Sequence, residues 1–158
     1  LKVTVNDAGK IRQIYVKYEI PQLTGSIKDR LAYYIFKEGY EKGDIKKNTK
    51  IVEVSSGNTA ISSTTLSRLL GHDITIVLPD WLTEERLKLL KLYGANLDFT
   101  SGKTAFIDAV KKAKEYKAKG YYYPDQFSSI ANVHAHQETT APELFSQLKK
   151  IGLTPDYF

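Results

Sequence analysis

The sequence predicts an α/β fold with a mostly parallel sheet and helices on both faces of that sheet. Short apolar segments alternate along the chain with longer helical stretches, which is the order expected of βαβ units. The central apolar segments are hydrophobic throughout, which indicates strands that are covered on both faces. The chain has 158 residues, 42% of them hydrophobic, and this length suits one domain or one lobe of a larger protein.

The N-terminal part combines extended segments with one long helix. Residues 1–5 and 14–17 are rich in β-branched side chains, so both are expected to be extended. A helix is expected over residues 26–42. The β-branched run 51–54 is the next expected strand.

The middle of the chain continues with helix, strand, helix and strand. The helix expected over 58–70 ends before Gly71, a residue typical of helix C-termini. The apolar run 74–78 is a strand. Leucines give the helix 83–93 an apolar side, and 96–100 is the strand that follows it.

The last third is expected to contain two more helices with a strand between them. The first helix covers 103–119 and is closed by Gly120. The tyrosine run 121–123 is expected to be a strand, because aromatic residues favour extended structure. The second helix covers 130–149.

Composition and charge exclude several classes of protein. Cysteine is absent, so neither a disulfide framework nor a thiolate metal site is expected. No apolar run approaches the length that spans a bilayer, so no membrane partner is expected. The net charge is +5, but the lysines from Lys111 to Lys119 share their helix with Glu115. This pattern favours a solvated helix face, and no nucleic-acid partner is expected.

Lys28 is the first candidate for chemistry, within the segment Thr24-Gly25-Ser26-Ile27-Lys28-Asp29-Arg30. Ser26 can cap the expected helix and Asp29 stands where a capping box needs an acid, so Lys28 falls in the first turn. The positive end of a helix disfavours an ammonium ion, and an amine that adds to a carbonyl must be neutral. The position therefore suits Schiff-base chemistry, with an ordinary surface lysine as the alternative.

The loop Ser55-Ser56-Gly57-Asn58-Thr59 is the second candidate. It follows the carboxyl end of an expected strand, where open α/β sheets bind ligands, and it opens a helix. Gly57 permits a close backbone approach or a positive φ, and the hydroxyls, the amide and the helix N–H groups can hold an anion. The residues leave open whether that anion is a carboxylate or a phosphate, or whether the loop is only a helix cap.

A metal site is not expected. His134, His136 and Asp125 are the residues nearest to a ligand set. A two-residue spacing on a helix points the two histidines in different directions, which argues against a shared ion.

Four segments in sequence order resemble those of one enzyme family. They are Lys17–Arg30, Glu53–Ala60, Leu78–Ala95 and Gln126–Glu143. Together they resemble the pyridoxal-phosphate (PLP) enzymes of the cysteine synthase and cystathionine β-synthase family, along nearly the whole chain. The resemblance implies the tryptophan synthase β-like fold and PLP as cofactor.

The resemblance also implies roles for individual residues. Lys28 would bind PLP as a Schiff base and then act as general base and acid at the substrate α-carbon. Asn58 would contact the ring hydroxyl of PLP. The substrate carboxylate would be held by Gln126 and by the loop residues Ser55, Ser56, Gly57, Asn58 and Thr59.

The activity implied by the resemblance is β-replacement on an O-activated serine. Cysteine synthase activity, from O-acetylserine and sulfide to cysteine and acetate, is the first hypothesis. The alternatives are a cystathionine β-synthase-like enzyme, a diaminopropionate-forming enzyme and a truncated binding module without catalysis. A small amino-acid substrate, a homodimer of the complete enzyme and a cytoplasmic location are expected.

The chain is expected to be the N-terminal portion of such an enzyme. The segment 156–158 resembles the strand that leads into the family's phosphate-binding loop, and the sequence contains no methionine. Within residues 1–158, residues 50–125 are expected to form the smaller α/β domain, which carries the substrate loop.

Overall fold

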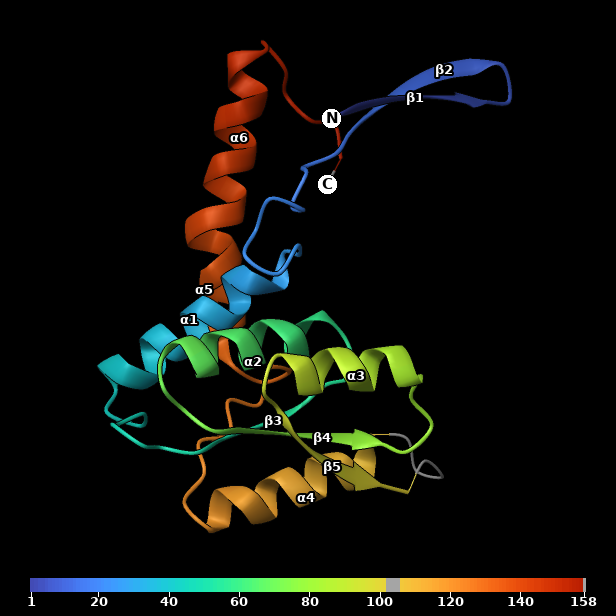
Figure 1. Ribbon diagram of the computed structural model, residues 1–158. Helices are drawn as coiled ribbons and strands as arrows, with labels where there is room; N and C mark the ends of the chain where they lie inside the picture. The colour runs from blue at the N-terminus through green and yellow to red at the C-terminus, as the bar shows by residue number, and fades with distance from the viewer. Residues whose placement is uncertain (102–105, 158) are drawn as a thin grey trace.

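A three-stranded parallel sheet lies at the centre of the structure, a computed structural model that describes residues 1–101 and 106–157 (Figure 1). Its strands are β3 (Ile51–Val54), β4 (Ile74–Pro79) and β5 (Asn96–Thr100), in the spatial order β3-β4-β5. Ile51 pairs with Ile74. The three strands agree with the prediction, and the parallel order follows from the helices that connect them.

Helices cover both faces of this sheet, as predicted (Figure 1). On one face lie α1 (Lys28–Glu41), α2 (Asn58–Leu69) and α3 (Glu84–Leu92), and on the other lies α4 (Ile107–Ala118). The strand side chains alternate between two cores. The α1–α3 side buries Ile51, Ile74, Ile76 and Leu78, while the α4 side buries Val52, Val54 and Val77 against Ala109 and Ala113.

A separate antiparallel hairpin precedes these layers. It consists of β1 (Lys2–Asp7) and β2 (Lys10–Tyr15). The expected extension of residues 1–5 is confirmed, but the second strand begins earlier than residue 14 and ends before Val16. Ala8 and Gly9 both have positive φ, as the two-residue turns of hairpins require. Alanine is not typical of such turns, so the sequence does not signal the hairpin.

The predicted strand over residues 121–123 is wrong. Only an isolated bridge joins Tyr122 to Ile51, through one hydrogen bond from Tyr122 N–H to Lys50 O and another from Val52 N–H to Tyr122 O. Gly120 turns the chain just before this point with a positive φ, and Pro124 has no N–H to donate just after it. The segment is therefore too short for a ladder.

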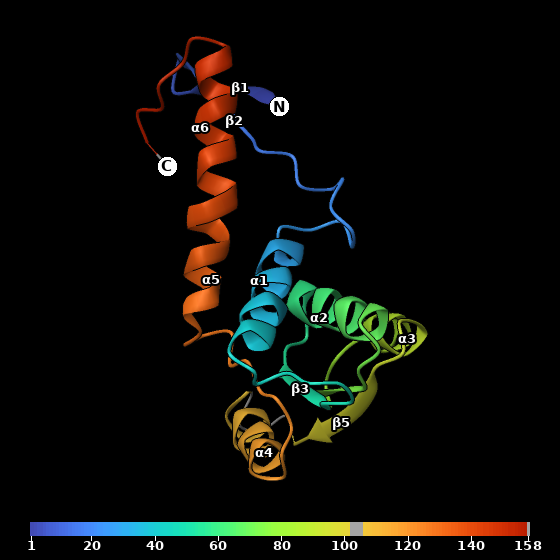
Figure 2. The ribbon, with the colours of Figure 1, turned by 90° about the vertical axis from the view of Figure 1, so that its left-hand side faces the viewer.

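The expected helix over 130–149 is divided into three parts. They are α5 (Ile130–Ala135), the π-helix η2 (His136–Thr140) and α6 (Ala141–Lys150). Pro142 lacks an N–H, and its ring crowds the carbonyl one turn earlier, so the helix widens just before it. Figure 2 shows the resulting rod, with α6 extending away from the sheet toward the β1–β2 hairpin.

The ends of several other elements differ slightly from the predictions. Helix α3 begins after Thr83, and Gly71 follows α2 with a positive φ, as expected. The first residues of the expected helix 103–119 lie outside the described residues, and α4 is observed from Ile107. Asp156 and Tyr157 form no strand, and Phe158 is outside the described part.

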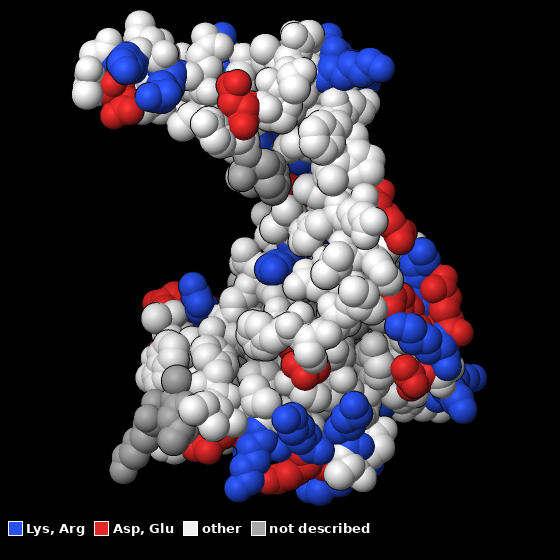
Figure 3. All heavy atoms as spheres, turned by 180° about the vertical axis from the view of Figure 1, so that it is seen from behind, with Lys and Arg blue, Asp and Glu red and all other residues white. Residues whose placement is uncertain are grey.

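Charged side chains of both signs share the surface around α4. Figure 3 shows them mixed at the lower end of the molecule. Lys111, Lys114 and Lys117 are exposed, and Lys112 pairs with Asp98 at 2.6 Å, which confirms the expected solvated helix face. Among residues 1–101 and 106–157, no helix combines the length and hydrophobicity needed to cross a bilayer.

Candidate active site

Lys28 is the first residue of α1, and its side chain is partly buried. The backbone N–H of Lys28 donates to Ser26 Oγ at 3.3 Å. The predicted capping box is wrong, because Ile27 is the N-cap residue and no side chain caps the helix. The Asp29 carboxylate is occupied elsewhere: it accepts hydrogen bonds from the N–H of Thr24 at 2.7 Å and from its hydroxyl at 2.5 Å.

The Thr24–Asp29 pair attaches the lysine segment to α2, the helix that begins at the 55–59 loop. Thr24 Oγ1 lies 3.1 Å from the hydroxyl of Ser62, a fully buried residue about one turn inside α2. Gly25 has a φ of +82°, a value that favours glycine, so the chain can turn back between Thr24 and Asp29. The tertiary structure thus brings the two candidate segments together.

Substitution of Asp29 by asparagine is expected to loosen this attachment. Asparagine offers one acceptor oxygen, so it loses one of the two bonds to Thr24, and a hydrogen bond to a charged group contributes about 1.5–3 kcal/mol. We expect amide hydrogen exchange at Thr24 to accelerate roughly tenfold or more. The exposed Asp7→Asn change in the hairpin is the control, and equal exchange rates in the two variants would contradict the role of Asp29.

The loop at residues 55–57 connects the carboxyl end of β3 to α2. Gly57 is the N-cap residue of α2 with a φ of −115°, so the positive φ that the sequence allowed is absent. A Cβ atom at Gly57 would meet nothing within 4 Å, which leaves room for a ligand close to the backbone. Ser55 Oγ accepts the Gly57 N–H at 3.2 Å, and Arg86 donates to Ser56 O at 3.2 Å.

Three polar side chains of this loop are unpaired among the described residues, although Thr59 is buried at 4% exposure. Within the described residues, the side chains of Ser56, Asn58 and Thr59 make no hydrogen bond, and Asn58 is exposed. The first backbone N–H groups of α2 lie beside them, at the positive end of the helix. The arrangement can therefore hold an anionic group.

Gln126 is buried against the same end of β3. Its Nε2 donates to Val54 O at 3.1 Å and to Glu53 Oε1 at 3.4 Å. The preceding residue, Asp125, has a φ of +47° and accepts hydrogen bonds from the Ser128 side chain and backbone. This strained turn directs Gln126 inward, next to the strand that leads into the loop.

Glu53 carries a buried carboxyl group, and no role in the site was predicted for it from the sequence. It is 1% exposed, and burial raises its pKa to about 8, an effect that the Asp125 carboxylate reinforces. Oε1 accepts the Val54 N–H at 2.8 Å, whereas Oε2 has no hydrogen-bond partner among the described residues. The signal in the sequence was a single acidic residue inside a four-residue apolar strand.

A cluster of four charged residues, also missed, joins the lysine segment to α6. Arg30 forms hydrogen bonds with both oxygens of Glu19 and both oxygens of Glu143, and Lys17 lies 2.8 Å from Glu143. The hydrogen bonds from Arg30 and Lys17 lower the pKa of Glu143 to about 2. The cluster links residues far apart in sequence, so no local pattern reveals it.

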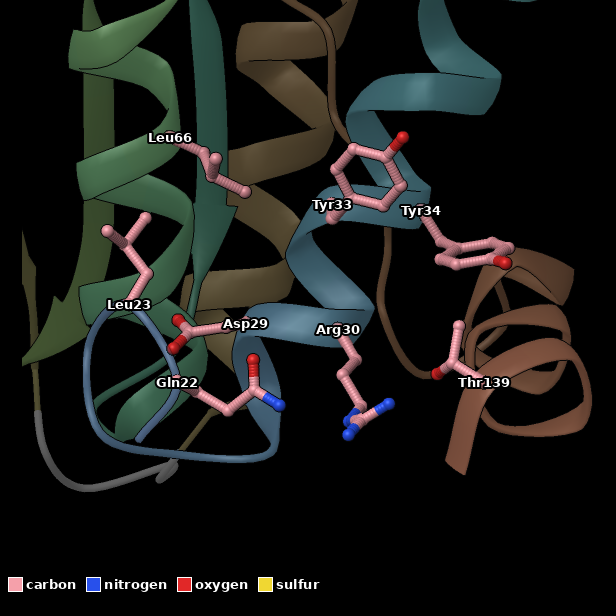
Figure 4. A pocket seen from close by; sticks show the side chains of 8 residues that line it. All are labelled: Gln22, Leu23, Asp29, Arg30, Tyr33, Tyr34, Leu66 and Thr139. Atoms are coloured by element: carbon pink, nitrogen blue, oxygen red, sulfur yellow. The ribbon is translucent and has the colours of Figure 1, made fainter. Parts of the chain in front are cut away.

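A cavity of about 270 Å³ lies beside this cluster (Figure 4). Figure 4 shows Asp29 and Arg30 on α1, with Gln22 and Leu23 in the loop before it. The other lining residues are Tyr33, Tyr34, Leu66 and Thr139, so the 55–59 loop does not border the cavity.

The three residues considered as metal ligands take up separate contacts. His134 Nδ1 lies 2.8 Å from Glu38, and His136 Nδ1 lies 2.9 Å from Thr140 Oγ1. Over residues 1–101 and 106–157, no three His, Asp or Glu side chains are grouped so that they could hold an ion. Burial lowers the pKa of His136, and the nearby charge of Lys28 lowers it further.

Comparison with known proteins places this arrangement in a family. A family model described as "Pyridoxal-phosphate dependent enzyme" matches residues 4–158. A cysteine synthase of Staphylococcus aureus is 41% identical over 146 residues, which are 92% of this chain and 46% of that protein. A probable cysteine synthase of Bacillus subtilis is 39% identical over 142 residues, 89% of this chain and 46% of that protein.

A solved structure extends the likeness to three dimensions. The crystal structure of a hydrogen sulfide-producing enzyme from Fusobacterium nucleatum matches with a TM-score of 0.94 at 40% identity, over 99% of this chain and 48% of that one. The expected tryptophan synthase β-like fold is confirmed for this portion. The chain spans about half the length of the relatives it matches. It belongs to the family of pyridoxal-phosphate dependent enzymes.

Proposed function

We propose that the complete enzyme carrying this chain is a PLP-dependent cysteine synthase, which converts O-acetylserine and sulfide to cysteine and acetate. The observation that carries the proposal is the attachment of the Lys28 segment to the helix of the 55–59 loop, through Thr24 and Ser62. The two cysteine synthases at 39% and 41% identity support this choice of activity.

The residues of this chain fit the cofactor. Lys28 supplies a primary amine at the start of a helix, and the loop 55–59 supplies unengaged polar groups with open space in front of Gly57. When bound, PLP supplies an electron sink for the loss of the α-proton and of the leaving group on Cβ. Asn58 is the proposed contact of the PLP ring hydroxyl.

The chain's own residues would bind the substrate and move its proton. We assign the grip on the α-carboxylate to the loop N–H and hydroxyl groups, because they surround the positive end of α2. Lys28 would take the proton from the substrate α-carbon and return it at the end of the reaction. Gln126 would complete the carboxylate grip from its place beside the carboxyl end of β3.

A second candidate function is the release of sulfide from an amino acid at the same site. The Fusobacterium enzyme is described as producing hydrogen sulfide, which favours release of sulfide from an amino acid with a thiol on Cβ. The same lysine and carboxylate grip would serve both reactions, because both remove a group from Cβ after the α-proton is lost. A non-catalytic module would show neither reaction.

The arrangement of the complete enzyme is also a proposal. Residues 50–125 would act as its smaller α/β domain, a range that contains β3, β4 and β5 together with α2, α3 and α4. A cytoplasmic homodimer is proposed for the complete enzyme, as the family resemblance implies. Sedimentation of the complete enzyme measures the oligomeric state.

The test of the cofactor chemistry is reductive trapping. The complete polypeptide is purified, its visible spectrum is recorded with and without added PLP, and borohydride is used to fix the adduct before peptide mapping. We expect a visible absorption band and a PLP-modified peptide that contains Lys28. A colourless protein, or an adduct at another lysine, would overturn the proposal.

The substrate assay separates the two candidate reactions. Untrapped holoprotein from the same preparation is given O-acetylserine with sulfide, or cysteine alone, and sulfide is measured. Consumption of sulfide supports the synthase, and release of sulfide from cysteine supports the second candidate.

A further inference from the structure

Glu53 is a carboxyl group enclosed beneath the substrate loop. It lies in β3 with 1% exposure, on the same face of the sheet as the core residue Ile51. Its Oε1 accepts hydrogen bonds from the N–H of Val54 and from Gln126 Nε2. Its Oε2 is buried with no partner among the described residues. Glu53 therefore belongs to the strand that leads directly into the 55–59 loop.

No cation offsets a charge on Glu53 in the part of the chain that the structure describes. The charged group that acts on it is the carboxylate of Asp125, and a charge on Glu53 would in turn raise the pKa of the phenols of Tyr122 and Tyr123. An isolated buried carboxylate is far less favourable than the neutral acid. Glu53 therefore holds a proton at neutral pH, with the accepting oxygen Oε1 turned toward Gln126.

The protonation state of Glu53 decides how firmly Gln126 is held. The bond from Gln126 Nε2 to Glu53 Oε1 is long, at 3.4 Å, while the bond to Val54 O is 3.1 Å. A neutral acid is a weak acceptor, so the amide hydrogen that points to Glu53 can be given to an incoming carboxylate. An ionised Glu53 would hold this hydrogen more strongly, because charge-assisted bonds are about twice as strong as neutral ones. An ionised Glu53 would also repel the carboxylate of the substrate.

We propose that Glu53, kept as an uncharged carboxylic acid, is the positioning residue that leaves the Gln126 amide available to the carboxylate of the substrate. This inference rests on the proposed function, in which Gln126 takes part in the carboxylate grip. It assigns no contact with substrate or cofactor to Glu53 itself. Glu53 acts through Gln126, so it governs substrate binding and leaves the chemical step at saturating substrate unchanged.

The first test is the pH dependence of KM in the complete holoenzyme, with O-acetylserine as substrate. The uncharged fraction of a group with a pKa of about 8 falls about fivefold between pH 8 and pH 9. We expect the wild-type KM to rise by this factor relative to that of Glu53→Gln, which cannot ionise. At pH 7 the two KM values should agree within about twofold, with equal kcat. Coinciding KM profiles would overturn the proposal.

The second test measures the proton directly. Infrared spectra of the complete protein labelled at the glutamate carboxyl should show a protonated-acid band at neutral pH that disappears as the pH rises past about 8. The band should be missing in Glu53→Gln and present in Glu84→Gln, which changes an exposed glutamate of α3. Wild-type protein without the band at neutral pH overturns the proposal, and this measurement remains decisive if Glu53→Gln does not fold.

The cofactor chemistry at Lys28 and the role of Glu53 are tested by separate measurements. If borohydride traps no PLP at Lys28, the proposed function fails whatever the infrared band shows. If Lys28 is trapped and O-acetylserine is turned over, but wild type and Glu53→Gln share one KM profile, only the role of Glu53 fails.

Discussion

Replacement of Lys28 by alanine in the complete enzyme is expected to lower kcat/KM by roughly 10³-fold or more. The residue would lose both of its proposed roles, the covalent attachment of the cofactor and the transfer of the α-proton. Proton transfer by a positioned side chain alone contributes about 10²–10⁴-fold. The measurement is the steady-state rate with O-acetylserine and sulfide, together with the visible spectrum, in which the band of the lysine adduct should be absent.

The matched control for this change is Lys42→Ala. Lys42 follows the other end of the same helix, where it is exposed and paired with Glu38. Exposed pairs of this kind contribute little to stability, so Lys42→Ala should keep nearly full turnover. Full turnover in Lys28→Ala would show that another group performs the chemistry, and the site proposed around α1 and α2 would be wrong.

Replacement of Ile76 by alanine is expected to destabilise the protein by about 2–5 kcal/mol. Ile76 lies in β4, the middle strand of the sheet, and is fully buried in the core beneath α1, α2 and α3. Truncation removes apolar contacts and leaves a cavity that neighbours on two strands cannot fill. Urea unfolding of the complete apoprotein, followed by circular dichroism, measures the change in the free energy of unfolding.

Leu92→Ala is the control for Ile76→Ala. Leu92 ends α3 and is 82% exposed, so its truncation should change the free energy of unfolding by less than about 0.5 kcal/mol. Equal losses in the two variants would mean that the central strand is not packed as observed. A loss in Ile76→Ala alone supports the two-sided packing of the sheet.

The sheet and most of its helices were predictable because their signals are local. A strand such as 74–78 is apolar on both faces only if both faces are covered, and Gly71 marks the end of the helix before it. Predictions from local patterns were wrong where an element depends on contacts with a distant segment of the chain. Residues 121–123 have the composition of a strand but form only one isolated bridge with β3 among the described residues, and the hairpin turn at Ala8 has no typical turn residue on its first position.

The candidate site was predictable to a similar extent. The lysine and the loop 55–59 could be found from residue types at helix starts and strand ends. Their mutual attachment through Thr24 and Ser62 could not, since it depends on how α1 packs against α2. The π-helix before Pro142 and the link from Arg30 to Glu143 also depend on contacts across the fold.

The sequence by itself determined the alternation of strands and helices from β3 to β5, the two covered faces of the sheet and the two segments that carry candidate catalytic and binding residues. Periodicity, capping and turn residues act over a few positions, so they can be recognised from the sequence alone. Only the tertiary structure decided that Glu53 is enclosed with no neighbouring cation among the described residues and that its oxygen meets Gln126. Burial and electrostatic environment depend on residues distant in sequence, and these set the protonation state on which the proposed substrate grip depends.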